Sequence, residues 1–185
     1  MRLCLSFACL AAATTGSAAD PLPSGLAPGQ RPGPYSSLVS VGSQRGQLHC
    51  FICETGDRPA VIVFSRHLSD PLGKLVQGLD QAVIERKGTD LRAWVTFLHE
   101  DQTAFDPDVV RWSKQQSVRA VPLGVFENVT GPPAYRLHRD ADVTVLLSVK
   151  QKVVQAFAFR QGELNDARIA EVLKALEAIA PAEKK

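Results

Sequence analysis

Residues 60–76 read AVIVFSRHLSDPLGKLV, and their pattern gives the clearest indication of the fold class. The segment AVIVFS is an apolar run of strand length, which is typical of a strand buried on both faces of a sheet. A polar residue, an acid and a proline follow at 69–71, a combination that favours the start of a helix. Beyond them, apolar residues recur at helical spacing as far as Gly88. The stretch therefore predicts a buried strand that leads into an amphipathic helix.

The rest of the chain alternates strand and helix patterns. Further strands are expected at 35–41, 47–53, 91–98, 121–126, 143–149 and 153–159, a short helix or turn at 131–138, and further helices from Asp106 and after Asn165. Strands that alternate with helices build a parallel sheet with helices on both faces. The order therefore predicts a single α/β domain, in which the last two strands form an antiparallel hairpin at the edge.

The N-terminus has the pattern of a secretory signal peptide. Arg2 precedes a short apolar run at 3–13, and the small residues SAA at 17–19 form the kind of site that signal peptidase cleaves. A membrane span needs about 20 apolar residues, and this run is shorter. We therefore expect residues 1–19 to be removed and the mature protein to be periplasmic or secreted, with no membrane span left after cleavage.

The mature chain is expected to consist of three parts. Residues 20–34, DPLPSGLAPGQRPGP, are rich in Pro and Gly and predict an extended leader. The folded domain is expected over 35–181 and a charged tail over 182–185. A formal net charge of +2 gives no reason to expect nucleic acid or an acidic membrane surface as a partner. No cofactor is expected either.

Signal cleavage leaves the mature chain with a single cysteine pair. Cys4 and Cys9 leave with the signal, and Cys50 and Cys53 remain in the segment LHCFICETG. Disulfides persist in exported proteins, so an idle dithiol is the least expected state. Three interpretations stay open: a redox-active pair, a structural disulfide, or part of a metal site.

The spacing of the pair bears on these three interpretations. Closing so short a loop removes unfolded-state entropy worth only about 2 kcal/mol, so a purely structural disulfide gains little from it. A structural zinc site would need a second ligand pair beyond Cys50, Cys53 and His49. Only six residues separate Cys53 from the first core strand, so no helix is expected to begin at Cys50. A protonated His49 would favour a thiolate at Cys50, and Glu54 would oppose one at Cys53.

The order of elements resembles the thioredoxin fold. It is most similar to the peroxiredoxin branch, the alkyl hydroperoxide reductase/thiol-specific antioxidant family, and to exported thioredoxin-like proteins, over residues 28–180. The segments that carry the resemblance are GQRPGPYS (29–36), PAVIVFSR (59–66), VPLGVFENVTGPPAYRLH (121–138) and VTVLLSVKQKVVQAFAF (143–159). The resemblance implies an α/β protein with a thioredoxin-like three-layer α/β/α sandwich, a mixed sheet and an N-terminal β-hairpin extension.

The chain departs from that family at the usual active site. The family places its reactive cysteine in the first helical turn after the first core strand, and here that place reads SRHLSDPLGK, residues 65–74, without a cysteine. The family often has a cis-proline before the hairpin strand, and DADVT at 140–144 has no proline. A second alignment would make Pro122 the cis-proline. We prefer the first alignment because it leaves a proper hairpin before the last helix.

The resemblance implies thiol–disulfide chemistry, and the relocated pair is where it would occur. By analogy with other CxxC proteins, Cys50 is expected to attack with the help of His49, and Cys53 to resolve the mixed disulfide. A protein thiol or disulfide would be the partner. The alternative is a non-catalytic binding or structural module whose CxxC pair is a structural disulfide.

A second candidate site lies at the carboxyl ends of the first two core strands, where sites occur in open α/β sheets. The residues expected there are Ser65, Arg66, His67, His99 and Glu100. If they converge, they would suit an anion or a metal without thiol chemistry. The other interpretation is that they are solvated loop residues.

Overall fold

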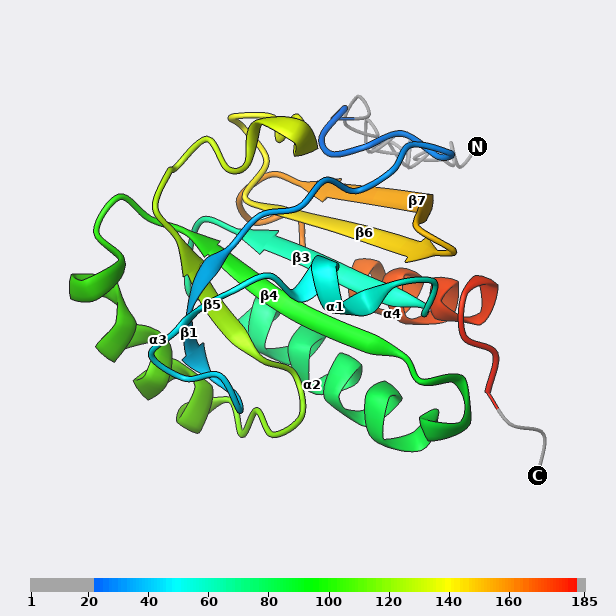
Figure 1. The fold of residues 1–185 in the computed structure, drawn as a ribbon, viewed down its shortest axis with the longest axis horizontal. Helices are drawn as coiled ribbons and strands as arrows, with labels where there is room; N and C mark the ends of the chain where they lie inside the picture. Colours follow the sequence, from blue (N-terminus) through cyan, green and yellow to red (C-terminus); the bar gives the residue numbers. More distant parts are fainter. Residues whose placement is uncertain (1–21, 183–185) are drawn as a thin grey trace, which may run out of the picture.

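A computed structural model describes residues 22–182, so the expected signal peptide lies outside the described residues. One mixed sheet of seven strands has the order β2-β1-β5-β4-β3-β6-β7 (Figure 1). The strands are β1 (Ser37–Val41), β2 (Leu48–His49), β3 (Ala60–Ser65), β4 (Arg92–Leu98), β5 (Leu123–Phe126), β6 (Val143–Val149) and β7 (Lys152–Phe159). The helices are α1 (Phe51–Thr55), α2 (Asp70–Glu85), α3 (Gln102–Gln115) and α4 (Asp166–Ala175), with the short 3-10 turns η1 (Lys87–Thr89), η2 (Pro133–Tyr135) and η3 (Leu176–Ala178).

The strand β3 lies at the centre of the sheet, as its apolar sequence predicts. All six of its residues are buried, and all six pair with β4 on one side and β6 on the other. The strands β3, β4 and β5 are parallel, whereas β6 and β7 form the expected antiparallel hairpin. An antiparallel hairpin of β1 and β2 extends the other edge of the sheet through β5.

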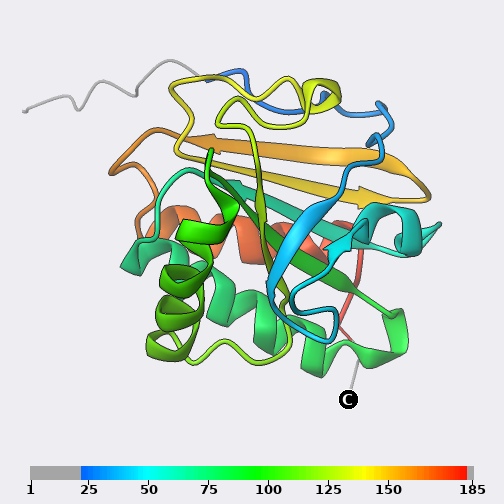
Figure 2. The same cartoon turned by 60° about the vertical axis from the view of Figure 1, so that its left-hand side comes forward.

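The two faces of the sheet are covered differently. The longer helices α2, α3 and α4 lie against one face (Figures 1 and 2). The other face, which we call the second face, is covered by α1, η2 and the extended segment 22–36. Val61 and Val63 point to the helical face, and Ile62 and Phe64 to the second face. The thioredoxin-like α/β/α sandwich with an N-terminal hairpin is therefore confirmed.

The helices α2 and α4 begin at side-chain caps that the sequence predicts. The Ser69 hydroxyl accepts a hydrogen bond from the backbone N–H of Leu72 at 3.3 Å, and Asn165 accepts one from the N–H of Arg168 at 3.1 Å. These caps satisfy N–H groups that have no partner inside the helix. The helix α2 ends at Glu85, earlier than the expected Gly88, because η1 takes up the next residues.

Two boundaries differ from the sequence prediction. The helix α3 begins at Gln102, with Asp101 as its cap, and not at Asp106. Pro107 therefore lies inside the helix, where it leaves one backbone carbonyl without its usual donor. The extra first turn lets Phe105 pack against Phe97, with ring centroids 6.0 Å apart. The predicted return strand 47–53 is reduced to Leu48–His49, because the chain then turns into α1.

The described part of the Pro/Gly-rich leader crosses the second face without helix or strand structure. Leu26 is buried there, and two backbone hydrogen bonds link the leader to β7, from Gly29 to Val153 and from Val153 to Gln30. Across residues 22–182, the structure contains no helix with the length and apolar character that a membrane span requires.

Candidate redox site

Cys50 and Cys53 form a disulfide across the first turn of α1. Their Cα atoms are 5.3 Å apart, and the N–H of Cys53 donates to the carbonyl of Cys50 at 3.1 Å. Cys50 is the N-cap residue and is half-buried, whereas Cys53 is exposed. The disulfide therefore lies at the surface, open to a thiol in solution.

The expectation that no helix begins at Cys50 is wrong. Five residues, Phe51–Thr55, form a short helix that ends at Gly56, whose φ of 58° is in the region that glycine adopts without strain. Phe51 and Ile52 pack on the second face of the sheet, and the Thr55 hydroxyl donates to the carbonyl of Phe51 at 2.8 Å. Burial of these two apolar side chains stabilises a helix that is too short to form alone.

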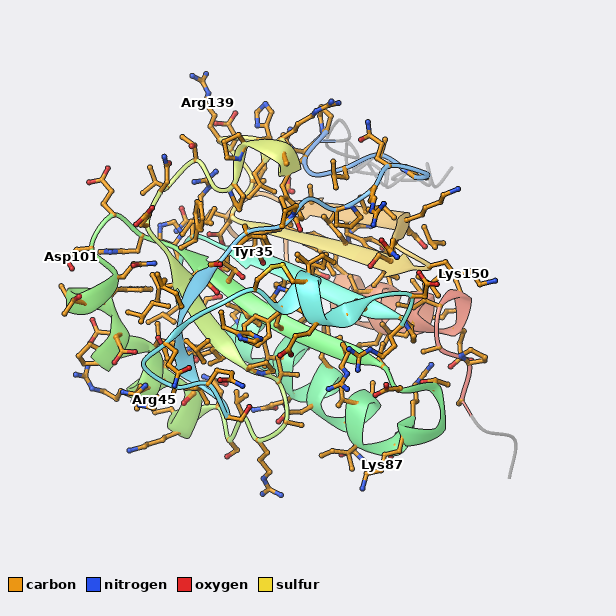
Figure 3. The ribbon with its side chains drawn as sticks, viewed as in Figure 1. Tyr35, Arg45, Lys87, Asp101, Arg139 and Lys150 are labelled. Atoms are coloured by element: carbon orange, nitrogen blue, oxygen red, sulfur yellow. A yellow bond between two sulfur atoms is a disulfide. The ribbon has the colours of Figure 1, made fainter. Side chains whose placement is uncertain are left out.

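An aromatic cluster lies beneath α1. The ring of Phe51 stacks on Trp94 at a centroid distance of 5.8 Å, and the Trp94 indole donates to the Tyr35 hydroxyl at 2.8 Å. Figure 3 shows Tyr35 beside α1 on this face. Burial raises the pKa of Tyr35 to about 12, although hydrogen bonds to Thr96 and Trp94 act in the opposite direction. The disulfide thus rests on a packed and hydrogen-bonded base.

His49 and Glu54 face each other beside the disulfide. Their Nε2 and Oε2 atoms are 3.3 Å apart, within ion-pair distance but without hydrogen-bond alignment. The His49 side chain is 15% exposed and lies edge-on to Phe51, with ring centroids 4.7 Å apart. The sequence predicts opposite effects of His49 and Glu54 on a cysteine thiolate. Because the two side chains lie against each other, a positive charge on His49 would face the negative charge of Glu54 as well as the disulfide.

Two hollows flank α1. The first has a volume of about 550 Å³ and is lined by His49, Phe51 and Glu54 together with Arg58, Lys87, Arg92 and Arg119, among other residues. The second, which we call the Cys53 groove, has a volume of about 470 Å³. It is lined by Arg31, Pro32, Gly33, Pro34, Ile52, Cys53, Gly56 and Gln151. Of the two cysteines, only Cys53 lines either hollow.

Arg66 follows the end of β3, within the cysteine-free segment 65–74. Its Nε donates to the carbonyl of Ala141 at 2.8 Å, and its two terminal nitrogens donate to the carbonyls of Val129 and His138. Burial lowers the pKa of Arg66, and the nearby Asp142 and Asp140 act in the opposite direction. Arg66 therefore ties the loop 127–142 to the end of β3. Ser65 is buried and donates to the carbonyl of His67 at 2.9 Å.

The histidines of the second candidate site have separate surroundings. His67 Nδ1 lies 2.6 Å from Asp142 Oδ1, whereas the His99 ring stacks on Phe105 at 4.3 Å. Glu100 is exposed, and within the described part of the chain neither it nor His99 contacts His67 through a hydrogen bond or an ion pair. Within residues 22–182, no group of three or more metal-ligating side chains could hold a metal ion.

The disulfide and the usual site lie at opposite ends of β3. Gln151, in the turn between β6 and β7, lines the Cys53 groove, and β6 residues near this turn pair with the start of β3. Arg66 and Asp142 lie at the other end, where Ser65 pairs with Val143. In Figure 3, Lys150 and Asp101 mark these two ends of the molecule. The Pro122 alignment also fails, because Pro122 precedes β5 and the hairpin follows separately.

Sequence reasoning missed the aromatic base and the Cys53 groove. The signal for the base was local, because the two residues between the cysteines, Phe51 and Ile52, are both apolar and both pack on the sheet. No local pattern marks the groove, since its walls come from the leader, α1 and the turn between β6 and β7.

Comparisons with known proteins find similarity in the fold alone. No family model matches the chain, and no curated protein matches it. A candidate protein disulfide isomerase from Bacteroides thetaiotaomicron has a TM-score of 0.62 at 15% identity, covering 85% of this chain and 92% of its own. A candidate thiol:disulfide interchange protein DsbE from Chlorobium tepidum has a TM-score of 0.60 at 14% identity, covering 82% of this chain and 99% of its own. The peroxidoxin BcpB of Mycobacterium tuberculosis has a TM-score of 0.60 at 14% identity, covering 82% of this chain and 97% of its own. The protein therefore has a thioredoxin-like fold.

Proposed function

We propose that the protein is an exported thiol–disulfide oxidoreductase that acts through Cys50 and Cys53. The observation that carries the proposal is a disulfide closed within one helical turn at the surface, with Cys53 exposed. Two of the structures with a similar fold bear names that refer to disulfide isomerisation and disulfide interchange. The segment 65–74, which corresponds to the active site of the family that the sequence resembles, has no cysteine, so the Cys50–Cys53 pair would be the only thiol chemistry of the mature chain.

The reaction would transfer two electrons between this pair and a protein partner. A thiolate of the partner attacks one sulfur of the disulfide, and the other sulfur leaves as a thiolate. A second thiolate of the partner then attacks the mixed disulfide and releases the first sulfur. The partner gains a disulfide, and Cys50 and Cys53 end as a dithiol. The reverse sequence would oxidise this protein and reduce the partner.

Export and the division of the chain belong to the same proposal. Removal of residues 1–19 would leave a mature protein that carries only the Cys50–Cys53 pair. It would consist of the leader 20–34, the domain 35–181 and the tail 182–185. An oxidising compartment would keep the pair in the disulfide state between encounters with a partner.

The test is the reduction potential of the pair in the mature protein. The protein is equilibrated in buffers of reduced and oxidised dithiol or glutathione, and the thiols are trapped and counted. We expect a potential above about −270 mV, in the range of known exchange proteins. A potential below about −300 mV would show a structural disulfide and refute the oxidoreductase function.

A second candidate function is a non-catalytic binding or structural module. The observation that favours it is the Arg66 network, in which Arg66, within the cysteine-free segment 65–74, donates hydrogen bonds to backbone carbonyls of the loop 127–142. In that case the edge with Arg66 and His67 would be the binding edge, for an anion. The same measurement separates the two functions, because only the module tolerates a disulfide that does not exchange.

A further inference from the structure

We infer that Cys53, and not Cys50, is the sulfur that the partner's thiolate attacks, and that the Cys53 groove receives the cysteine-bearing segment of the partner. The inference rests on the proposed function, since it assigns roles within the same pair. It reverses the order that analogy with other CxxC proteins suggests, in which the first cysteine attacks.

The two cysteine residues are unequally exposed. Which sulfur of a disulfide is attacked depends on access as well as on the chemistry of the leaving thiol. Cys53 is exposed, whereas Cys50 is half-buried where β2 passes into α1. Cys50 also follows directly on His49, which is largely buried against Phe51. An incoming thiolate therefore has a more open approach to Cys53.

The hollow next to the disulfide is also on the Cys53 side. Cys53 lines the Cys53 groove, and the 550 Å³ hollow on the other side of α1 is lined by neither cysteine. A volume of about 470 Å³ falls within the range of specific binding sites, which are roughly 300–1,000 Å³. A partner segment that enters the groove brings its cysteine to Cys53 without displacing any part of the fold.

The walls of the groove indicate the chemistry of the segment. Pro34 and Ile52 present apolar surface, and proline fixes the backbone so that this wall exists before binding. Arg31 is the one charged residue that lines the groove. Its guanidinium donates to the side chain of Gln151, a neutral partner that leaves its charge uncompensated by that bond. The groove therefore suits an extended peptide with an apolar residue and either an acidic residue or a thiolate near the cysteine.

The partner's thiolate forms a bond to Cys53 Sγ while the Cys50–Cys53 bond breaks, and the electron pair leaves with Cys50 as its thiolate. A second thiolate of the partner then attacks the partner's own sulfur in the mixed disulfide, and Cys53 leaves as a thiolate. The partner loses two electrons and two protons. Cys50 and Cys53 gain them and become a dithiol.

The test compares the single-cysteine variants C50S and C53S of the mature protein. Each is reduced, checked for folding by circular dichroism, and reacted with the anionic disulfide 5,5′-dithiobis(2-nitrobenzoate), whose release of a coloured thiolate gives the rate. The rates are compared at alkaline pH, where both thiols are ionised, so that access and not the thiolate fraction sets the difference. We expect Cys53 in C50S to react at least about tenfold faster than Cys50 in C53S. Equal rates, or a faster Cys50, would overturn the assignment.

A charge variant tests the groove in the C50S background. Arg31→Gln removes its one positive charge, and Lys150→Gln removes an exposed charge nearby that does not line the groove. We expect Arg31→Gln to slow the anionic reagent several-fold, and Lys150→Gln to change the rate little. The neutral reagent 4,4′-dithiodipyridine should be much less sensitive to Arg31→Gln. If Arg31→Gln reacted with the anionic reagent as fast as the C50S parent, the role of the groove would be refuted.

Failure of the inference and failure of the proposed function give different results. If the wild-type disulfide resists reduction, the oxidoreductase function is refuted, and the relative rates of the two single-cysteine variants are a separate observation. If the wild-type pair exchanges readily but Cys50 reacts faster, the function stands and the assignment of Cys53 is refuted.

Discussion

Replacement of both Cys50 and Cys53 by alanine is expected to cost about 2 kcal/mol in the free energy of unfolding. The disulfide joins residues three positions apart, and closing so small a loop removes about 2 kcal/mol of unfolded-state entropy. Side-chain burial adds little to the loss, because Cys53 is exposed and Cys50 is only half-buried. The contacts of Phe51 and Ile52 with the sheet remain in the variant, so α1 keeps its apolar anchor.

Urea and thermal unfolding, followed by circular dichroism, measure this difference. For a domain of this size, about 2 kcal/mol corresponds to a fall in Tm of roughly 4–8 °C. Reduced wild-type protein is the matched control, since it lacks the disulfide but keeps both side chains, and it should unfold close to the variant. A loss of more than about 4 kcal/mol, or a variant that does not fold, would refute the reasoning and would identify the disulfide as structural.

Two further predictions concern buried polar groups. The Asp80 carboxylate accepts hydrogen bonds from the backbone N–H groups of Arg119, Ala120 and Val121 at 2.5–3.0 Å. The substitution Asp80→Asn turns an amide N–H toward one of these N–H groups. We expect it to lower the free energy of unfolding, measured in urea, by about 2–3 kcal/mol. A change below about 0.5 kcal/mol would contradict this account of Asp80. Since burial raises the pKa of Tyr35 from 10.0 to about 12, its neutral form stabilises the fold below about pH 10, and this contribution is lost as the pH rises toward about 12. Tyr35→Phe should flatten the alkaline fall in the urea midpoint, and an unchanged fall would refute this role.

The elements that the sequence predicted well are those whose pattern repeats. The run AVIVFS predicted β3, and the repeat of apolar residues with the Ser69 cap predicted α2. The hairpin of β6 and β7 followed from two β-rich runs separated by three polar residues. Such segments bury enough apolar surface that their local pattern and their final structure agree.

The short helix α1 could not be predicted in this way. Five residues span too few turns for a helical repeat to appear, and the choice between strand and helix is made by packing on Trp94, which lies far along the chain. The start of α3 differs from the sequence prediction for a related reason. An acid followed by a proline at 106–107 is typical of a helix start, but the Asp101 cap and the packing of Phe105 begin the helix one turn earlier.

The candidate site was predictable in its residues and not in its geometry. The CxxC pair and the missing cysteine at 65–74 are visible in the sequence. The unequal exposure of Cys50 and Cys53 depends on the direction in which α1 leaves β2, which spacing does not encode. The loops after β3 and β4 place their histidines in different surroundings, because His99 stacks on Phe105 while His67 pairs with Asp142.

The contribution of the disulfide to stability and its reduction potential are thermodynamically linked. Whatever free energy the folded protein gives to the disulfide over the dithiol makes the pair harder to reduce than the same pair in an unfolded chain. For a two-electron couple, about 1.4 kcal/mol corresponds to about 30 mV, so a contribution of about 2 kcal/mol lowers the potential by only about 40 mV. A contribution of about 4 kcal/mol would lower it by about 90 mV, toward the values of structural disulfides. Because Cys53 is exposed and α1 is anchored by Phe51 and Ile52, we expect the smaller value, which leaves the pair within reach of a partner's thiols.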